Sequence, residues 1–232
     1  MIFLRDNPLQ FSNHCLQTSC EFDQTTLSEE VIQEYGIALP DNLSTAIEKR
    51  KAEYIAGRYC ALQSLKKLSP NMISNFGTNE DRSPQWPEGF VGSITHSKGF
   101  ASAVVAQKEF IQSIGIDSEK LIKEKTANNI HSHILTETEN YEDNAWVSED
   151  FQEYLTLVFS AKESIFKCLH PLVKQYFDFR DAKINFSPSR PNTFNYELLK
   201  SLSNDYDIGF TGEGQYAIAE NFVHTGVVIN QL

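Results

Sequence analysis

The sequence lacks features that would place the protein in several common classes. Basic residues are few, with 20 Lys and Arg against 31 Asp and Glu, so the formal net charge is −11. This deficit argues against nonspecific binding to nucleic acid or anionic membranes, because both reward basic surface. No stretch approaches the roughly 20 apolar residues of a membrane span, and the first residues lack the pattern of a secretion signal. We therefore expect a cytoplasmic protein without a membrane span or a nucleic-acid partner.

Cysteine is also scarce, and its spacing fits no metal site. The sequence has four cysteines, Cys15, Cys20, Cys60 and Cys168, without a CxxC pair or a His/Cys ligand spacing. We interpret them as thiols, although a disulfide between Cys15 and Cys20 is conceivable. Repeats and low-complexity tracts are absent as well. With 41% hydrophobic and 22% charged residues in 232 positions, the composition instead predicts a folded chain with a sizeable core.

Two long helices are predicted, one in each half of the chain. After a turn at Pro40-Asp41-Asn42, Thr45 to Glu48 fits a capping box, and apolar residues then recur at helical spacing as far as Ser69-Pro70. The second helical pattern runs from Phe151 to Leu169, and we expect Pro171 to end it.

Strand signals follow each predicted helix. Asn71 to Pro87 resembles a loop, and the next two strands, Phe90 to His96 and Ala101 to Gln107, predict a hairpin around Ser97-Lys98-Gly99. Ile111 to Asp117 is a third strand, and the polar sequence after it has mixed helix and loop character. Further short strands are expected at 183–186, 206–211, 215–219 and 223–229. The order of elements predicts an α+β fold with two halves, residues 1–110 and 111–232.

Two acidic side chains stand at the end of the third strand. Asp117 and Glu119 are two residues apart, so they point to the same side of an extended segment. Paired carboxylates suit a hard cation such as Mg²⁺. Taken alone, a solvated strand end carrying two acids is the favoured interpretation of the pair. The acidic residues Glu137, Glu139, Glu142 and Asp143 are interpreted as a solvated face.

A second cluster lies within the second predicted helix. Glu163 and Lys167 are four residues apart and share a helix face, whereas Lys162 lies about 100° away around the axis. A carboxylate beside amines is useful in phosphoryl chemistry. A surface ion pair, or a capping box from Ser160 to Glu163, is the ordinary alternative, but the apolar period runs unbroken through Ser160.

A third cluster ends the first strand of the predicted hairpin. Thr95 and His96 carry a hydroxyl and an imidazole that can donate hydrogen bonds to a phosphate. A histidine with ordinary hydrogen-bond partners at a strand end is the simpler reading of this feature alone.

These clusters, together with residues 49–58 (KRKAEYIAGR) and 82–87 (RSPQWP), resemble the phosphopantetheinyl transferases of siderophore and nonribosomal peptide synthesis. The enterobactin-synthase type is the most similar branch, and the resemblance covers roughly Glu48 to Leu169. It implies a monomer of two pseudo-symmetric α/β halves, with coenzyme A as substrate held between them. The substrate partner would be an apo acyl, peptidyl or aryl carrier protein domain.

The resemblance also implies a role for each candidate residue. Mg²⁺ would be held by Asp117, Glu119 and Glu163, and Glu163 would also be the base that deprotonates the carrier serine. Lys167 would assist the leaving group, and Lys162 would neutralise charge on the pyrophosphate. The phosphates and the adenine region of coenzyme A would be gripped by Arg50, Arg58, Arg82, Thr95 and His96. Arginine suits this role because its planar guanidinium can donate two parallel hydrogen bonds to phosphate oxygens.

Three alternatives stay open at this point. The protein could act mainly on a fatty-acid carrier protein, although the trimeric holo-carrier-protein synthases are about half this length. It could be a catalytically silent coenzyme A binder, which the retained carboxylates and Lys167 disfavour. It could also be a Mg²⁺-dependent phosphohydrolase, in which case the basic residues upstream would be incidental.

Overall fold

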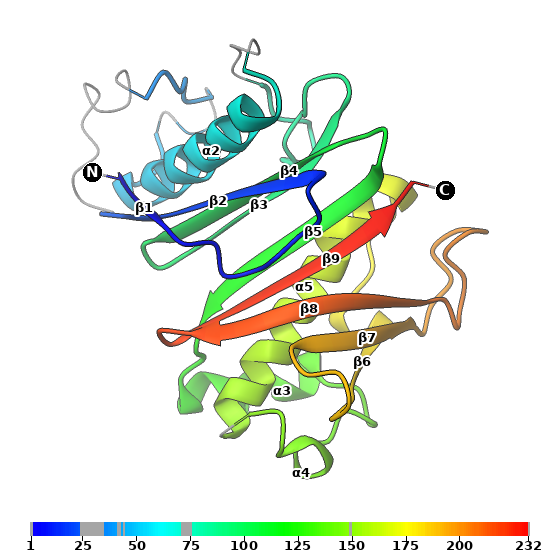
Figure 1. Cartoon of the computed structure of the whole chain (residues 1–232). Helices are drawn as coiled ribbons and strands as arrows, with labels where there is room; N and C mark the ends of the chain where they lie inside the picture. The colour runs from blue at the N-terminus through cyan, green and yellow to red at the C-terminus, as the bar shows by residue number, and fades with distance from the viewer. Residues whose placement is uncertain are drawn as a thin grey trace. The chain divides into compact units, whose positions relative to one another are not determined.

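A computed structural model describes residues 2–23, 35–40, 43, 45–70, 76–148 and 150–231. Its helices and largely antiparallel strands form an α+β structure, as predicted (Figure 1). The chain divides into two compact units, one of Met1–Ile114 with Asn230–Leu232 and the other of Gly115–Ile229. The division falls within one strand. Within the described residues, no helix is long and apolar enough to cross a membrane.

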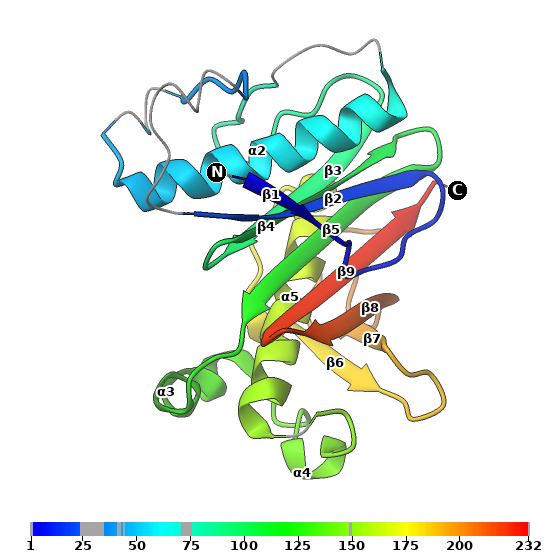
Figure 2. The same cartoon turned by 60° about the vertical axis from the view of Figure 1, so that its left-hand side comes forward.

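The first unit is a four-stranded sheet with one long helix. The sheet has the order β1-β2-β4-β3, and helix α2 (Glu48–Leu68) packs mainly on β2 and β4 (Figure 2). Small buried residues such as Ala52, Ala56 and Ala101 line this contact, so the helix can approach the strands closely. The strands are β1 (Ile2–Arg5), β2 (Cys15–Phe22), β3 (Phe90–Ser97) and β4 (Phe100–Gln107).

The predicted hairpin is confirmed in detail. Ser97 pairs with Phe100, so only Lys98 and Gly99 form the turn between β3 and β4. Both turn residues have positive φ, 43° and 90°. Two successive positive φ values are typical of the type I′ turn, whose twist matches the flanking strands.

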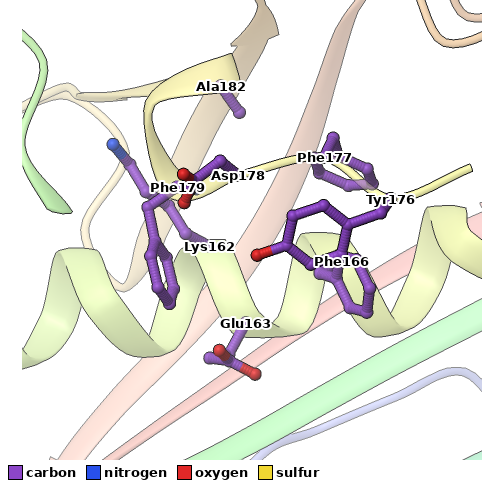
Figure 3. A pocket seen from close by; sticks show the side chains of 8 residues that line it. All are labelled: Lys162, Glu163, Phe166, Tyr176, Phe177, Asp178, Phe179 and Ala182. Atoms are coloured by element: carbon purple, nitrogen blue, oxygen red, sulfur yellow. The ribbon is translucent and has the colours of Figure 1, made fainter. Parts of the chain in front are cut away.

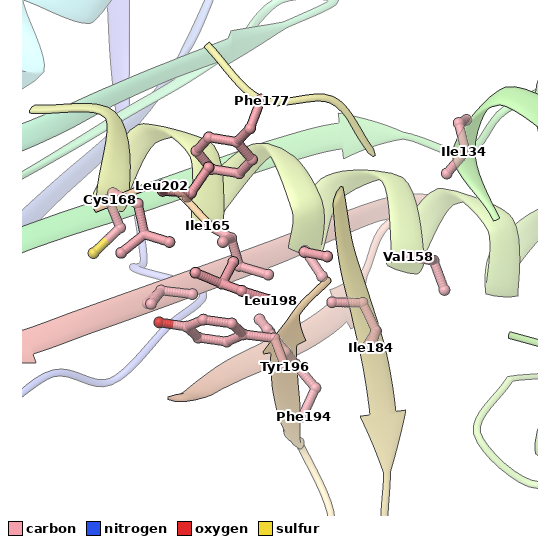
Figure 4. Packing of buried hydrophobic residues seen from close by; sticks show 14 of the residues in the cluster. Ile134, Val158, Ile165, Cys168, Phe177, Ile184, Phe194, Tyr196, Leu198 and Leu202 are labelled. Carbon is pink, nitrogen blue, oxygen red and sulfur yellow. The ribbon is translucent and has the colours of Figure 1, made fainter. Parts of the chain in front are cut away.

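The second unit packs a long helix on a five-stranded sheet of order β5-β9-β8-β7-β6 (Figure 1). Its core gathers side chains of helix α5 (Phe151–Val173) with those of the sheet, among them Ile165, Phe194 and Tyr196 (Figure 4). The strands are β5 (Ile111–Lys120), β6 (Ala182–Phe186), β7 (Thr193–Leu198), β8 (Thr211–Ala219) and β9 (Phe222–Asn230). The shorter helices are α3 (Glu124–Ile134), α4 (Tyr141–Asn144) and the 3-10 turn η2 (Phe179–Asp181).

Helix α5 begins where the apolar pattern predicted but ends later. The side chain of Asp150 accepts a hydrogen bond from the backbone N–H of Glu153 and caps the start. The prediction that Pro171 ends the helix is wrong, because the helix includes Pro171 and continues to Val173. A proline in the last turn removes little of the hydrogen-bond ladder, and Lys174 in the left-handed conformation then ends the helix.

Other predicted boundaries also need correction. Helix α2 starts at Glu48 after Ile47 without a side-chain cap, so the capping box from Thr45 is wrong. The strand predicted at 206–211 is absent: the backbone turns there, with Leu202 N–H donating to Tyr206 C=O, and β8 starts at Thr211. Asp41, Asn42 and residues 71–75 lie outside the described residues. None of the four cysteines forms a disulfide in the described structure, as interpreted.

Candidate functional site

The acidic end of β5 lies against helix α5 because the strand has a glycine at the contact. A Cβ at Gly115 would be 2.1 Å from the carbonyl oxygen of Ser164 and 2.5 Å from the backbone nitrogen of Cys168. No other residue allows so close an approach of strand and helix. Strand alternation puts Asp117 and Glu119 on the same face as Gly115. Both carboxylates are therefore directed to the side of α5.

Asp117 and Lys167 form the central contact of this region. Lys167 Nζ donates to Asp117 Oδ1 at 2.6 Å, and the Asp117 side chain is only 3% exposed. Burial alone would lower the pKa of Lys167, but the negative charges of Asp117, Glu163 and Glu119 together raise it. The ammonium is therefore kept charged by all three carboxylates that the sequence singled out.

Glu163 lies one helical turn before Lys167 on the same face of α5. Burial raises the pKa of Glu163, the charge of Lys167 partly opposes this rise, and Asp117 adds to it. A carboxylate with a raised pKa holds a proton more readily than an ordinary surface glutamate. That property suits proton transfer near neutral pH.

An aromatic pocket opens beside Glu163. It has a volume of ≈ 110 Å³ and lies between α5 and the segment that leads into η2 (Figure 3). Tyr176 lies at the edge of the pocket and is 71% exposed, which is unusual for so large an aromatic side chain. The pocket is lined by Lys162, Glu163, Phe166, Tyr176, Phe177, Asp178, Phe179 and Ala182.

Lys162 lines the same pocket as Glu163, but its ammonium is bound away from that residue. Its ammonium is buried and donates to Glu139 Oε2 at 2.6 Å and to the carbonyl oxygen of Ile134 at 2.7 Å. Burial lowers the pKa of Lys162, and the charge of Glu139 opposes this change. The interpretation of Glu139 as part of a solvated face is wrong, because Glu139 is 3% exposed.

Ser118 faces away from the two acids that flank it. Its hydroxyl lies 2.9 Å from Nδ1 of His224 on the neighbouring strand β9. Both residues are buried, and burial lowers the pKa of His224 to about 4. No role for His224 could be predicted from the sequence, because no local motif marks a histidine whose partner is 106 residues away.

In the first unit, the structure brings Arg50 and His96 together. Arg50 Nη1 lies 3.0 Å from His96 Nε2, and Glu53 is within 3.8 Å of both side chains. Thr95 is buried on the opposite face of β3. Arg50 and His96 are therefore a polar pair at the surface of the unit, and Thr95 does not extend that surface.

Arg58 has a different environment from Arg50. Its guanidinium donates to the carbonyl oxygen of Phe76 at 3.1 Å and to Thr78 Oγ1 at 2.8 Å, and lies over the rings of Tyr54 and Phe76. No carboxylate pairs with Arg58 among the described residues. A pocket of ≈ 360 Å³ within this unit is lined by Tyr54, Arg58 and Phe76.

Arg82 stands in the loop that continues from this pocket. An isolated bridge between Thr78 and Pro84 closes the loop, and Arg82 is exposed within it with a φ of 68°. In the described part of the chain, no hydrogen bond joins Arg82 to Arg50 or Arg58. The loop stem is nevertheless tied to Arg58 through the hydroxyl of Thr78.

Comparison with known proteins identifies the family. Residues 39–106 match the model of the 4'-phosphopantetheinyl transferase N-terminal domain, and residues 113–220 match that of the 4'-phosphopantetheinyl transferase superfamily. The 4'-phosphopantetheinyl transferase Npt of Nocardia iowensis is 31% identical over 195 residues, covering 80% of this chain and 85% of that protein. The chain belongs to the 4'-phosphopantetheinyl transferase superfamily.

Two further proteins and one solved structure are similar to parts of this chain. Enterobactin synthase component D of Salmonella typhi is 36% identical over 162 residues, which cover 69% of this chain and 64% of that protein. The transferase PptT of Mycobacterium tuberculosis is 32% identical over 146 residues, covering 62% of each. Holo-[acyl-carrier-protein] synthase of Thermotoga maritima aligns with a TM-score of 0.39 at 21% identity, covering 53% of this chain and 65% of that chain.

For a phosphopantetheinyl transferase, the described structure gathers part of the predicted site. Asp117, Glu163 and Lys167 interact in the second unit, and Glu119 acts on the pKa of Lys167. Among the described residues, no three His, Cys, Asp or Glu side chains are gathered closely enough to hold a metal ion. All the same, the donor set consists of carboxylate oxygens, which is the chemistry that Mg²⁺ prefers.

Proposed function

We propose that the protein transfers the phosphopantetheine arm of coenzyme A to a serine of an apo carrier protein and releases 3',5'-ADP. The observation that carries this proposal is the arrangement on one face of α5: Glu163, with a raised pKa, lies one turn from Lys167, which donates to Asp117. A base and a fixed cation beside carboxylates are what the attack of a serine hydroxyl on a pyrophosphate ester requires.

Glu163 is the proposed base. The hydroxyl of the carrier serine is a poor nucleophile until its proton is removed. Glu163 takes that proton while a bond forms between the serine oxygen and the phosphorus that bears pantetheine. The bond from this phosphorus to the bridging oxygen breaks, and the bridging oxygen leaves with 3',5'-ADP.

Lys167 is proposed to offset the charge that develops on the leaving phosphate. Its raised pKa keeps the ammonium protonated at neutral pH, and its contact with Asp117 fixes its position. A cation held in place before the reaction stabilises the transition state without reorganising.

We also propose that Asp117, Glu119 and Glu163 hold Mg²⁺. The support is the all-oxygen donor set and the combined effect of the three charges on Lys167. When bound, Mg²⁺ would neutralise pyrophosphate charge as it does in other phosphoryl transfers. Calorimetric titration of the chelator-treated protein with Mg²⁺ alone tests this, because Glu119→Gln should weaken the binding that the wild type shows.

In the first unit, Arg50, Arg58, Arg82 and His96 are the proposed contacts of coenzyme A. Arg58 supports this best, because a buried guanidinium beside an aromatic pocket offers a phosphate contact next to a surface for a base. Thr95 and Lys162 are left out, since the first is buried on the other face of β3 and the second is held by Glu139.

The aromatic pocket beside Glu163 is the proposed contact surface for part of the pantetheine arm. Its rings lie next to the base, where the pantetheine portion must lie if its phosphorus is to be attacked. We propose that Phe166 and Tyr176 contact the arm. A Tyr176→Ala variant should then raise KM for coenzyme A.

The carrier is proposed to be a peptidyl or aryl carrier domain of siderophore synthesis. The support is the likeness to enterobactin synthase component D. A transferase that acts mainly on a fatty-acid carrier protein is the nearest alternative.

One assay tests the function and separates these carriers. The protein is incubated with coenzyme A, Mg²⁺ and an apo aryl, peptidyl or fatty-acid acyl carrier protein, and the phosphopantetheine adduct is measured by mass spectrometry. We expect the adduct with wild type and its loss with Glu163→Gln, while coenzyme A still binds. An exposed glutamate on the same unit, Glu213→Gln, serves as control and should keep full activity. Absence of an adduct on every carrier would contradict the transferase function.

A further inference from the structure

We propose that the buried ion pair of Glu139 and Lys162 positions Glu163, an inference that rests on the transferase function proposed above. The pair belongs to the second unit, and its side chains are 1% and 2% exposed. Lys162 lines the pocket beside Glu163, but its ammonium donates to Glu139 and to the carbonyl oxygen of Ile134. Glu139 and Lys162 are therefore positioning residues that act through helix α5.

Lys162 joins helix α5 to the end of helix α3. Its ammonium donates to the carbonyl oxygen of Ile134, the last residue of α3, at 2.7 Å. Carbonyl groups at a helix C-terminus lack partners within the helix and attract a cation. The ammonium thus holds α5 against α3 by charge as well as by a hydrogen bond.

Glu139 joins the same ammonium to two other segments. Its Oε2 accepts from Lys162 Nζ at 2.6 Å and from the backbone N–H of Thr136 at 2.7 Å, and its Oε1 accepts from the backbone N–H of Ile184 at 2.6 Å. Ile184 belongs to strand β6 at the edge of the five-stranded sheet. One carboxylate therefore ties α5 to the sheet and to the turn after α3.

The position of Lys162 next to Glu163 gives the pair its effect on the site. Successive residues of a helix project about 100° apart. Figure 3 shows Lys162 and Glu163 leaving α5 on different sides. Because Lys162 is fixed on one side, the helix cannot turn about its axis, and Glu163 is held in one direction on the other.

This role differs from the phosphate contact that the family resemblance implied for Lys162. To reach a phosphate, the ammonium of Lys162 would have to break its ion pair with Glu139. The buried carboxylate of Glu139 would then have no counter-charge, which is strongly unfavourable. The two roles also predict different kinetics. Loss of a phosphate contact weakens coenzyme A binding, whereas loss of a positioning contact lowers kcat and leaves that binding intact.

The test compares Glu139→Gln, Lys162→Met and the double variant. Each single variant should lower kcat by about 10²-fold, because small displacements of a catalytic group have effects of this size. The dissociation constant of coenzyme A, measured by calorimetry, should stay unchanged in both. The double variant leaves no unpaired buried charge and should lose less activity than the two single losses combined.

A matched control pair lies on the same unit. Lys183 and Glu197 form an ion pair at 2.9 Å between β6 and β7, but they are about one-third exposed and far more hydrated. Lys183→Met and Glu197→Gln should therefore keep the wild-type kcat. If a single variant at Glu139 or Lys162 does not fold, Glu139→Asp and Lys162→Arg replace it, because they retain the charge and move its position.

Amide hydrogen exchange gives a readout that does not depend on transfer. Peptides that cover residues 160–167 should exchange faster in Glu139→Gln than in wild type. In the control variants Lys183→Met and Glu197→Gln, the same peptides should exchange at the wild-type rate. Wild-type kcat with unchanged exchange in the single variants would overturn the inference. Weaker coenzyme A binding in Lys162→Met alone would also overturn the inference, because it would indicate that Lys162 contacts a phosphate of coenzyme A. A wild type that modifies no carrier would contradict the transferase function, and the exchange result would still decide the positioning role.

Discussion

The hydroxyl of Ser118 lies 2.9 Å from Nδ1 of His224, and this contact joins the strand that carries Asp117 to strand β9. Ser118 points away from the two acids beside it, so its hydrogen bond fixes the strand without occupying the face that they share. His224 is buried, and its pKa is lowered to about 4 by burial, with Asp117 partly opposing the change. The strand is therefore anchored by an imidazole that must stay neutral.

This anchor predicts a pH dependence of stability. Because the pKa of His224 falls from 6.5 to about 4 on folding, the unfolded chain binds more protons than the folded protein between these values. The free energy of unfolding should decrease as the pH is lowered through this window, by an amount on the order of 3 kcal/mol from this one group. Urea unfolding of wild type at a series of pH values from 7 to about 4 measures the decrease.

His224→Asn provides the control for this titration. Asparagine keeps a polar atom near the hydroxyl of Ser118 but does not titrate. The variant should be less stable than wild type at pH 7 and should lose less stability on acidification. Parallel pH profiles in the two proteins would show that His224 does not contribute.

Gly115 sets a second stability prediction. Gly115→Ala places a methyl group within 2.1 Å of the carbonyl oxygen of Ser164, so β5 and α5 must separate. We expect a loss of about 3 kcal/mol of unfolding free energy and a fall in kcat, because Asp117 moves away from Lys167. Thermal and urea unfolding measure the first and the carrier assay the second. Gln112→Ala on the same strand should have a small effect on the unfolding free energy. Equal losses of unfolding free energy in the two variants would contradict the close-contact role of Gly115.

Sequence patterns predicted the elements whose signals are local. The β3–β4 hairpin and the start of α5 follow from turn residues and helical period within a few positions. Strand β7 was missed although Phe194, Tyr196 and Leu198 alternate with polar residues, a period that is readable. Strand β2 was also missed, since its residues are buried on both faces and lack alternation.

The candidate site was predictable only where its residues share one element or one motif. Asp117 with Glu119 and Glu163 with Lys167 are such pairs, and the structure joins the two pairs through Lys167. The partners of Lys162 were not predictable, because Glu139 is 23 residues away and belongs to an acidic run that resembles solvated surface. Long-range contacts of this kind depend on packing rather than on local sequence.

Lys167 is expected to affect both the rate and its pH dependence. Its charge lowers the pKa of Glu163 against the larger effect of burial, so removing it should raise that pKa further. In Lys167→Met, kcat should fall by about 10²-fold through loss of the fixed cation, and the acid limb of the pH–rate profile should move to higher pH. Rates on one carrier protein across pH give both quantities. An acid limb that moves to lower pH, or stays in place, would argue against Glu163 as the base.

Arg58 allows the coenzyme A contacts of the first unit to be tested apart from catalysis. Arg58→Lys keeps the positive charge but loses the planar group that lies over Tyr54 and Phe76 and the paired hydrogen bonds to Phe76 and Thr78. We expect the dissociation constant of coenzyme A to rise about tenfold, the effect of losing one charge-assisted hydrogen bond. Calorimetry with coenzyme A, and in parallel with dephospho-coenzyme A, shows whether the lost contact is to the ribose phosphate. Lys66→Arg, an exposed exchange of the same two residue types in the last turn of α2, is the control and should leave the affinity unchanged. Unchanged affinity in Arg58→Lys would restrict Arg58 to a structural role in holding the segment at Phe76.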